Sequence, residues 1–297
     1  MSSEFAGTVT ADPRPIQVTG EVFSMKKVGD YFLLTIVADG IAERTRPGHF
    51  VALAVGGETS GTLLRRAFSI YRVRPAGVYG GTVEIVFAAH GAGTRWMARL
   101  QPHDPIDVVG PLGRPFALPK EPVACALVGG GYGSAPLFDL AERLRERRCG
   151  VHMVLGAATE TKLFGALEAK RAAQSVTVTT VDGSVGIKGM VTDALPALIT
   201  RNKVEVVYAC GPMGMLQAVT RVAGEYGAWC QTAVEESMAC GIGVCMTCVM
   251  PVRGDDNVVR MVRSCVEGPV FAGDKVQWEA VGTIPAGTYG APRGGGQ

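Results

Sequence analysis

The chain has 297 residues, of which 47% are hydrophobic and 19% are charged, and its formal net charge is +2. This length exceeds a single hydrophobic core and predicts two or three domains, and the composition excludes a largely disordered protein. Basic residues are scattered and no apolar run is long enough to cross a bilayer, which argues against nucleic-acid and membrane partners. The N-terminus lacks the pattern of a secretory signal, so we expect a cytoplasmic protein.

The first half of the chain has the pattern of an antiparallel β-barrel. Residues 1–15 are expected to be disordered, and residues 16–115 are expected to form the barrel. Five runs of β-branched or aromatic residues are separated by Gly, Pro and Asp; they are IQVTGEVFSM, YFLLTIVA, HFVALAV, FSIYRV and TVEIVFAA. A helix, AGTRWMARL, is expected after the fifth run. The segment LGRPFALPKEP contains three prolines and is typical of a linker to a second domain.

Residues 122–234 alternate between apolar runs and helical patterns. This alternation predicts a doubly wound α/β domain with a parallel sheet. The expected strands are VACALV, VHMVLG, VTVTTV, VEVVYAC and WCQTAV. Helices are expected near residues 134–148 and 162–171, and over MVTDALPALI and MLQAVTRVAGEYG.

After Val234 the periodicity stops, and residues 235–282 form a small unit rich in Cys and Gly. A unit of this size cannot bury a large core and is expected to depend on a bound cluster for its fold. Residues 283–297, which contain repeated Gly and Pro, are expected to form a disordered tail.

Half of the eight cysteines lie in this third unit. Cys240, Cys245, Cys248 and Cys265 are separated by four, two and sixteen residues, which is the spacing of plant-type [2Fe–2S] ligands. The glycines of CGIGVC allow the backbone to curl around a cluster and to direct N–H groups at its sulfur atoms. Zinc sites usually have two Cx2C pairs or histidines, and this segment has one such pair and no histidine. A zinc site and unligated thiols remain the alternatives.

The remaining cysteines and the histidines do not form a second motif. Cys125, Cys149 and Cys230 are dispersed and are expected to be reduced thiols, with Cys125 and Cys230 packed in buried strands. The four histidines are too dispersed for a metal site, so we expect structural or solvent-exposed roles for them.

Two glycine motifs follow predicted strands of the α/β domain. In LVGGGYGSAP, Gly129, Gly131 and Gly133 would let a pyrophosphate approach the N-terminus of the next helix, although a tight strand–helix turn has the same pattern. Pro136 gives the form GxGxxP, seen in ferredoxin–NADP reductase-like proteins. In ACGPMGML, Cys210 either faces a nicotinamide ring or is a small buried residue at a strand end.

Two motifs of the barrel have residue types that suit a flavin. In RRAFSI, the Arg66 guanidinium suits a pyrophosphate, and Ser69 lies three residues further on, beside Phe68. A surface strand with ordinary charges is the alternative. In HGAGTRW, the entry into a helix offers a second phosphate-binding point, or an ordinary cap made by Thr94.

Eight motifs occur in a fixed order along the chain: RRAFSI, HGAGT, VGPLG, LVGGGYGSAP, DGSVGIKGMVTDAL, ACGPMGML, ESMACGIGVCMTC and CVEGPVF. Together they resemble the electron-transfer subunits of the two-component dihydroorotate dehydrogenases of bacteria, over roughly residues 16–280. The cysteine segment and DGSVGIKG are the most specific parts. The flavin and nucleotide motifs occur throughout the ferredoxin reductase-like superfamily.

The resemblance implies an FAD-binding barrel, an NAD-binding domain and a [2Fe–2S] module held by the four clustered cysteines. It further implies a separate FMN-containing catalytic subunit, a heterotetramer with two subunits of each kind, and a role in pyrimidine biosynthesis. The residues that the family pattern places around FAD are Arg66, Ala67, Phe68, Ser69, Val86, Phe87, Ala88, Gly93 and Thr94. Two positions depart from the superfamily, because Phe68 stands where Tyr is usual and Ala88 where Arg is frequent.

The segment after the second strand of the α/β domain bears on the choice between NAD and NADP. After the second strand of the α/β domain, Thr159, Glu160 and Thr161 offer no arginine pair for a 2′-phosphate, which favours NAD. A diaphorase-type subunit of a hydrogenase or of a ferredoxin–NADP transhydrogenase would use the same three modules. A binding module with structural glycines and a zinc ion is the alternative outside redox chemistry.

Overall fold

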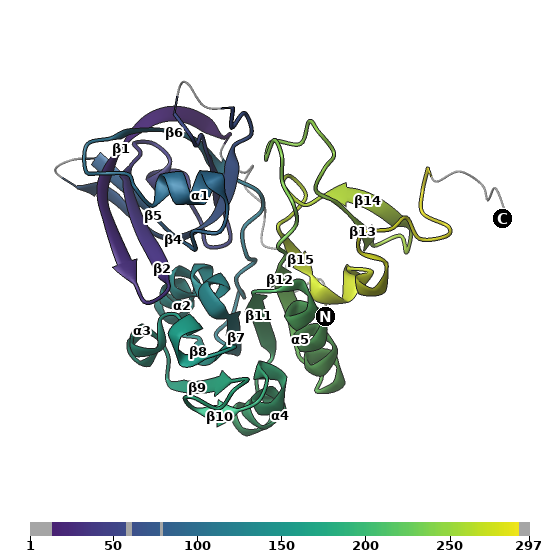
Figure 1. Cartoon of the computed structure of the whole chain (residues 1–297). Coiled ribbons are helices and arrows are strands. Elements are labelled where there is room, and N and C mark those ends of the chain that lie inside the picture. The colour runs from purple at the N-terminus through teal and green to yellow at the C-terminus, as the bar shows by residue number, and fades with distance from the viewer. Residues whose placement is uncertain (1–13, 58–60, 78–79, 291–297) are drawn as a thin grey trace.

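The computed structural model describes residues 14–290 apart from 58–60 and 78–79 (Figure 1). It consists of a closed antiparallel barrel, a seven-stranded sheet flanked by helices, and a two-stranded sheet near the C-terminus. The predicted fold class, a barrel followed by a doubly wound parallel sheet and a small C-terminal unit, is therefore confirmed. The segments 1–13 and 291–297, which belong to the ends predicted as disordered, lie outside the described residues.

The barrel contains six strands in the order β1-β2-β5-β4-β3-β6. They are β1 (Ile16–Val28), β2 (Tyr31–Val37), β3 (Phe50–Leu53), β4 (Arg66–Gly77), β5 (Gly80–Phe87) and β6 (Pro105–Leu112). A one-turn helix η1 (Ala42–Arg44) precedes β3, and α1 (Ala92–Met97) is shorter than the predicted AGTRWMARL. Strand β6 was not predicted, because its two prolines and one glycine are typical of loops. This strand pairs with both β1 and β3 and closes the barrel.

The second sheet has the strand order β10-β9-β8-β7-β11-β12-β15. Its strands are β7 (Ala124–Gly130), β8 (Gly150–Ala157), β9 (Ser175–Thr180), β10 (Ile187–Lys188), β11 (Val206–Cys210), β12 (Trp229–Ala233) and β15 (Val270–Ala272). All pairs are parallel except the last, β12 with β15. The two short edge strands, β10 and β15, were not predicted.

Four helices cover this sheet on both faces (Figure 1). They are α2 (Pro136–Glu146), α3 (Ala166–Ala172), α4 (Val191–Asn202) and α5 (Met213–Glu225), with the short turns η2 (Gly131–Ser134) and η3 (Glu160–Lys162). Alternate residues along each strand point to opposite faces. Leu127 therefore packs with α2 and α3, whereas Val128 packs with α4 and α5. Two hydrophobic cores on either side of one sheet are the expected result of a doubly wound connection.

The C-terminal unit is more closely joined to the sheet than the sequence suggested. It contains a hairpin of β13 (Val249–Arg253) and β14 (Val259–Arg263), the strand β15, and the turns η4 (Gly273–Lys275) and η5 (Trp278–Ala280). The segment 283–290 was predicted as part of a disordered tail. In the structure, the Tyr289 N–H donates to the Val259 carbonyl at 2.8 Å, and the Thr288 side chain is buried. The first half of the tail is therefore attached to β14.

The barrel packs against the helical face formed by α2 and α3. Tyr31 of β2 donates a hydrogen bond to the Lys162 carbonyl at 2.8 Å. On β4, Tyr71 and Arg72 both bind the Glu168 carboxylate of α3, and Arg72 also lies 3.3 Å from Glu142 of α2. These contacts hold the barrel beside the carboxyl edge of the parallel sheet. No helix in the described part of the chain is both long and apolar enough to span a membrane.

Candidate functional site

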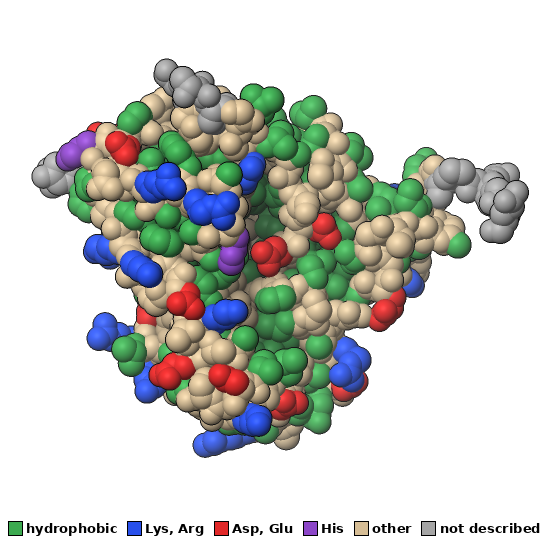
Figure 2. Space-filling model, in the orientation of Figure 1, with side chains coloured by type: hydrophobic (Ala, Val, Ile, Leu, Met, Phe, Trp, Pro, Cys, Tyr) green, Lys and Arg blue, Asp and Glu red, His purple; other side chains and the backbone are tan. Residues whose placement is uncertain are grey.

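A cavity of about 820 Å³ lies between the barrel and the carboxyl edge of the parallel sheet. We call it the cofactor cleft, and the surface of the molecule is hollowed between these two parts (Figure 2). It is large enough for a dinucleotide-sized ligand, since ligand pockets typically measure about 300–1,000 Å³. Ten of the residues predicted to bind cofactors line it: Ala67, Phe68, Ser69, Val86, Phe87, Ala88, Thr94, Gly131, Gly133 and Cys210.

The cleft lies at the point where the strand order of the sheet reverses. β7 is the first strand, β8 lies on one side of it and β11 on the other, so the connections diverge between β7 and β11. Cys210 at the end of β11 is in register with Gly129 of β7 and with Ala233 of β12. Open α/β sheets bind their ligands at this kind of switch point, outside the carboxyl ends of the strands.

The glycine turn after β7 brings two backbone segments into close contact. A Cβ atom on Gly133 would lie 2.9 Å from the Gly211 Cα, so only glycine allows the turn and the loop after β11 to touch. Gly131 has a φ of +55° and borders the cleft. Gly129 is not part of the lining, and a Cβ there would lie 2.4 Å from the Ser134 Cβ. The absence of a side chain at Gly129 therefore allows η2 to pack tightly on β7.

The flavin motif of the barrel forms the opposite wall. The Phe68 and Phe87 ring centroids are 5.9 Å apart, and both rings line the cleft. Arg66 and Gly93 do not line it, but they are neighbours, because a Cβ on Gly93 would lie 3.5 Å from the Arg66 Nε. The Arg66 Nη1 donates to the Leu64 carbonyl at 2.7 Å. The guanidinium is thus held beside the start of α1, at the edge of the cleft.

Thr94 has a capping role in addition to its place in the lining. Its Oγ1 accepts hydrogen bonds from the His90 and Gly91 backbone N–H groups, both at 3.0 Å. Gly91 is the N-cap residue of α1, so Thr94 is the third residue inside the helix. From this position its hydroxyl accepts from backbone N–H groups at the start of the helix. The capping alternative considered from the sequence is therefore present, with Thr94 in a different position from the one expected.

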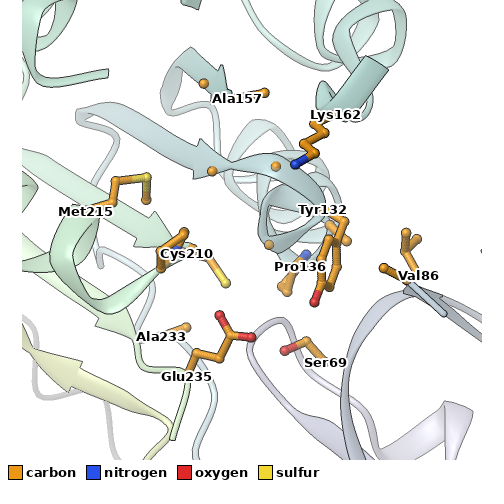
Figure 3. Close-up of a pocket in the computed structure, with 18 of the residues that line it drawn as sticks. Ser69, Val86, Tyr132, Pro136, Ala157, Lys162, Cys210, Met215, Ala233 and Glu235 are labelled. Carbon is orange, nitrogen blue, oxygen red and sulfur yellow. The ribbon is translucent and has the colours of Figure 1, made fainter. Parts of the chain in front are cut away.

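Cys210 is both buried and part of the cleft, so the two interpretations of the sequence are compatible. Its side chain is 6% exposed. Burial, with a smaller contribution from the Glu235 carboxylate, raises the pKa of the Cys210 thiol to about 12, which keeps it neutral at physiological pH. Figure 3 shows the Cys210 sulfur and the Glu235 carboxylate turned toward the same space, with Ser69 on the barrel side.

Several residues of the lining were not predicted from the sequence. Glu235 is the second residue after β12, and the rule that ligands bind at the carboxyl ends of strands could have identified it. Tyr132 lies inside the glycine motif itself. Tyr31, Lys162 and Met238 carry no local signal, because they reach the cleft only through tertiary packing.

The cysteine loop, residues 240–248, has the features expected of a ligand loop for an anionic cluster. The Val244 and Cys245 N–H groups donate to the Cys240 sulfur at 3.3 and 3.4 Å. Gly241 and Gly243 have φ angles of +71° and +85°, which side-chain-bearing residues rarely adopt. Hydrogen bonds involving Thr247 and Cys240 lower the pKa of Cys245 to about 6, so it has thiolate character near neutral pH.

The other two thiols lie deeper. Cys248 and Cys265 are 2% and 1% exposed, and burial together with Cys248 raises the pKa of Cys265 to about 12. Over residues 14–290, apart from the two gaps, no group of three or more His, Cys, Asp or Glu side chains is arranged to hold a metal ion. The fit to a [2Fe–2S] cluster therefore rests on the N–H groups directed at sulfur, the two glycines and the spacing of the thiols.

Three side chains of the cofactor cleft also pack in the hydrophobic cluster that contains two of the cysteines. Phe50, Ala67 and Met238 line the cleft. The same three residues belong to the hydrophobic cluster that contains Cys248 and Cys265. The Phe50 ring also lies 3.7 Å from the position of a Cβ on Gly241. A ligand in the cleft and a group held by the cysteines would therefore have these three side chains as common neighbours, which we call the shared wall.

Comparison with known proteins identifies the family. Residues 235–277 match the iron–sulfur cluster binding domain of dihydroorotate dehydrogenase B, and residues 127–221 match the oxidoreductase NAD-binding domain. The chain is 34% identical to the dihydroorotate dehydrogenase B (NAD(+)) electron transfer subunit of Fusobacterium nucleatum, over 89% of this chain and 96% of that protein. It belongs to this family. The subunit of Geobacillus thermodenitrificans is 37% identical over 82% of this chain and 91% of that protein.

Solved structures agree with the family assignment. A chain of an NADH-dependent reduced ferredoxin–NADP oxidoreductase superposes with a TM-score of 0.77 at 30% identity, over 89% of this chain and 91% of that chain. A ferredoxin–NADP+ reductase from Neisseria gonorrhoeae with bound FAD and NADP gives a TM-score of 0.57 at 15% identity, over 72% of this chain and 92% of that chain. The second similarity shows a shared ferredoxin reductase-like fold only.

Proposed function

We propose that this protein is the electron transfer subunit of an NAD-linked dihydroorotate dehydrogenase, with FAD and NAD(H) in the cofactor cleft and a [2Fe–2S] cluster on Cys240, Cys245, Cys248 and Cys265. The observation that carries the proposal is the shared wall of Phe50, Ala67 and Met238 between the cleft and the cysteines. Bound FAD would exchange two electrons with NAD(H) as hydride and single electrons with an iron–sulfur cluster. The adjacency of the cleft and the cysteines supports this sequence of transfers.

The side chains of the cleft suit this chemistry. Phe68 and Phe87 provide an apolar surface for a flavin ring, and Arg66 at the rim provides a forked cation for a pyrophosphate. Cys210 presents a neutral thiol where the sheet motifs would place a nicotinamide ring. The Gly133 and Gly211 contact brings the glycine turn and the loop after β11 together around the same space.

The proposal includes a partner. The electrons would pass to or from a separate catalytic subunit that oxidises dihydroorotate, on which the family resemblance places FMN, in pyrimidine biosynthesis. Cys245 is exposed, so the cysteine loop reaches the surface where a partner can approach. The family resemblance further suggests a heterotetramer with two subunits of each kind, and the N-terminal sequence pattern suggests a cytoplasmic location.

A diaphorase-type subunit of a hydrogenase or of a ferredoxin–NADP transhydrogenase is the alternative. The similarity to the NADH-dependent reduced ferredoxin–NADP oxidoreductase chain is the observation in its favour. The curated relatives from three genera, at 33–37% identity, are all named as dihydroorotate dehydrogenase B subunits and favour the first proposal.

Two measurements test the proposal. The anaerobically purified protein should show flavin absorption bands and a broad reddish shoulder, and a colourless protein that contains zinc would refute the redox function. Mixed with a candidate FMN-containing catalytic subunit, the protein should support dihydroorotate-dependent reduction of NAD. If it instead couples NADH only to ferredoxin or to a hydrogenase subunit, the alternative is correct.

A further inference from the structure

The positive and negative side chains that line the cofactor cleft lie on different sides of it. Of the described residues that line it, Lys162 is the only lysine or arginine. The carboxylates of the lining, Glu235 and Glu236, follow β12. Figure 3 shows Lys162 and Glu235 on opposite sides of the cavity, with the Lys162 amine directed inward. A ligand with an anionic part and a cationic or hydrogen-bond-donating part would therefore bind in one orientation.

The backbone of Lys162 is held in place beside the glycine turn. Tyr31 donates a hydrogen bond to the Lys162 carbonyl at 2.8 Å. A Cβ on Gly131 would lie 3.8 Å from this carbonyl oxygen and 3.6 Å from the Tyr31 hydroxyl. The start of η3 is anchored as well, because the Glu160 N–H donates to the Ser184 hydroxyl at 2.8 Å. The lysine is thus fixed next to the backbone that the glycine motif leaves open.

The Lys162 ammonium has no protein partner within the part of the chain that the structure describes. No hydrogen bond or ion pair involves its Nζ, whereas its backbone makes the contacts above. An ammonium group is a strong donor and binds phosphate as a point charge. Its free position at the edge of a glycine turn is the arrangement that suits a diphosphate.

We propose that Lys162 binds the diphosphate of NAD(H) together with the glycine turn, and that it sets the orientation of the dinucleotide in the cleft. This inference rests on the proposed function and extends it to a residue that no motif contains. The diphosphate lies at the Lys162 side, and the nicotinamide lies toward Cys210 and Glu235. FAD has its own cation, because Arg66 lies on the barrel side of the cleft beside Gly93.

The test compares Lys162→Met with Lys170→Met in the full chain loaded with its cofactors. Lys170 is an exposed residue of α3 outside the cleft, so its variant controls for the loss of one positive charge. ADP-ribose is the probe, because it carries the diphosphate without the nicotinamide. Its inhibition constant is measured against NADH oxidation with ferricyanide as acceptor. Lys162→Met should weaken ADP-ribose binding about tenfold at low salt and less at high salt, while Lys170→Met leaves it unchanged.

Three results would overturn the inference. One is an equal inhibition constant in Lys162→Met and wild type. Another is loss of bound FAD in Lys162→Met, which would assign the lysine to the flavin. A third is a much larger loss for NADPH than for NADH, which would assign it to a 2′-phosphate. Failure of the proposed function would appear differently, as a wild-type protein without flavin or without NADH oxidation. Lys162→Arg should retain most of the affinity, because it keeps the cation.

Discussion

Gly133→Ala tests the contact on which the shape of the cofactor cleft depends. A Cβ at this position would lie 2.9 Å from the Gly211 Cα, 3.3 Å from the Gly211 nitrogen and 3.6 Å from the Cys210 carbonyl carbon. All three are backbone atoms, so no side-chain rotation can relieve the overlap. A normal carbon–carbon contact is about 3.5 Å, and the glycine turn and the loop after β11 would have to separate by about 0.6 Å.

This separation should reduce both stability and NADH binding. Overpacking of this kind typically costs about 1–3 kcal/mol of unfolding free energy. Gly133 does not have a positive φ, so the penalty is steric and contains no backbone strain. Because the two segments flank the predicted nicotinamide site, we also expect the affinity for NADH to fall about tenfold, which corresponds to about 1.4 kcal/mol.

The assay combines urea unfolding with titration of flavin reduction by NADH. Gly224→Ala is the matched control, since nothing lies within 4 Å of a Cβ at this position in α5. Gly224 lies in the last turn of α5, so this change should stabilise the protein by less than the roughly 0.5–1 kcal/mol expected in a helix interior. Wild-type stability and NADH affinity in Gly133→Ala would refute the argument, because the two backbone segments would then have room for a methyl group.

Three further predictions concern the cysteine loop, the flavin motif and a buried histidine. Cys245→Ser should abolish the cluster and electron transfer between FAD and the partner, yet leave NADH reduction of FAD largely intact; normal NAD+-dependent orotate production by this variant would contradict the pathway. Arg66→Ala should lower the flavin content of the purified protein, and unchanged content would remove this residue from the site. Burial, with a smaller effect of Arg46, lowers the pKa of His49 to about 4, and His49 Nδ1 accepts a hydrogen bond from the Arg46 N–H at 3.0 Å. The folded state therefore disfavours protonation of His49. Its contribution to the free energy of unfolding is fully present above the unfolded pKa of about 6.5 and is lost as the pH falls toward 4. The total loss is up to about 3 kcal/mol. Urea unfolding between pH 7 and 4.5 should show this slope in wild type and a smaller slope in His49→Gln.

The sequence determined the features that depend on short stretches of chain. Strand runs in the barrel and the strand–helix alternation of the sheet were readable, because side-chain periodicity is a local property. The same holds for the cysteine spacing over residues 240–248 and for the glycine turn after β7, whose ligand-binding geometry is built within one segment. From these motifs and their order, the family and the kinds of cofactor could be inferred.

The tertiary structure decided which distant segments meet. It closed the barrel with β6, whose composition is typical of a loop, and it joined β15 to the parallel sheet. It brought Lys162 to Tyr31, which is 131 residues away, and it placed Phe50 between the cleft and the cysteines. These contacts depend on the closure of long loops and on packing between separate elements, and no local pattern encodes them. The sequence therefore predicted the kinds of cofactor, and only the fold showed that the cleft and the cysteine cluster share Phe50, Ala67 and Met238.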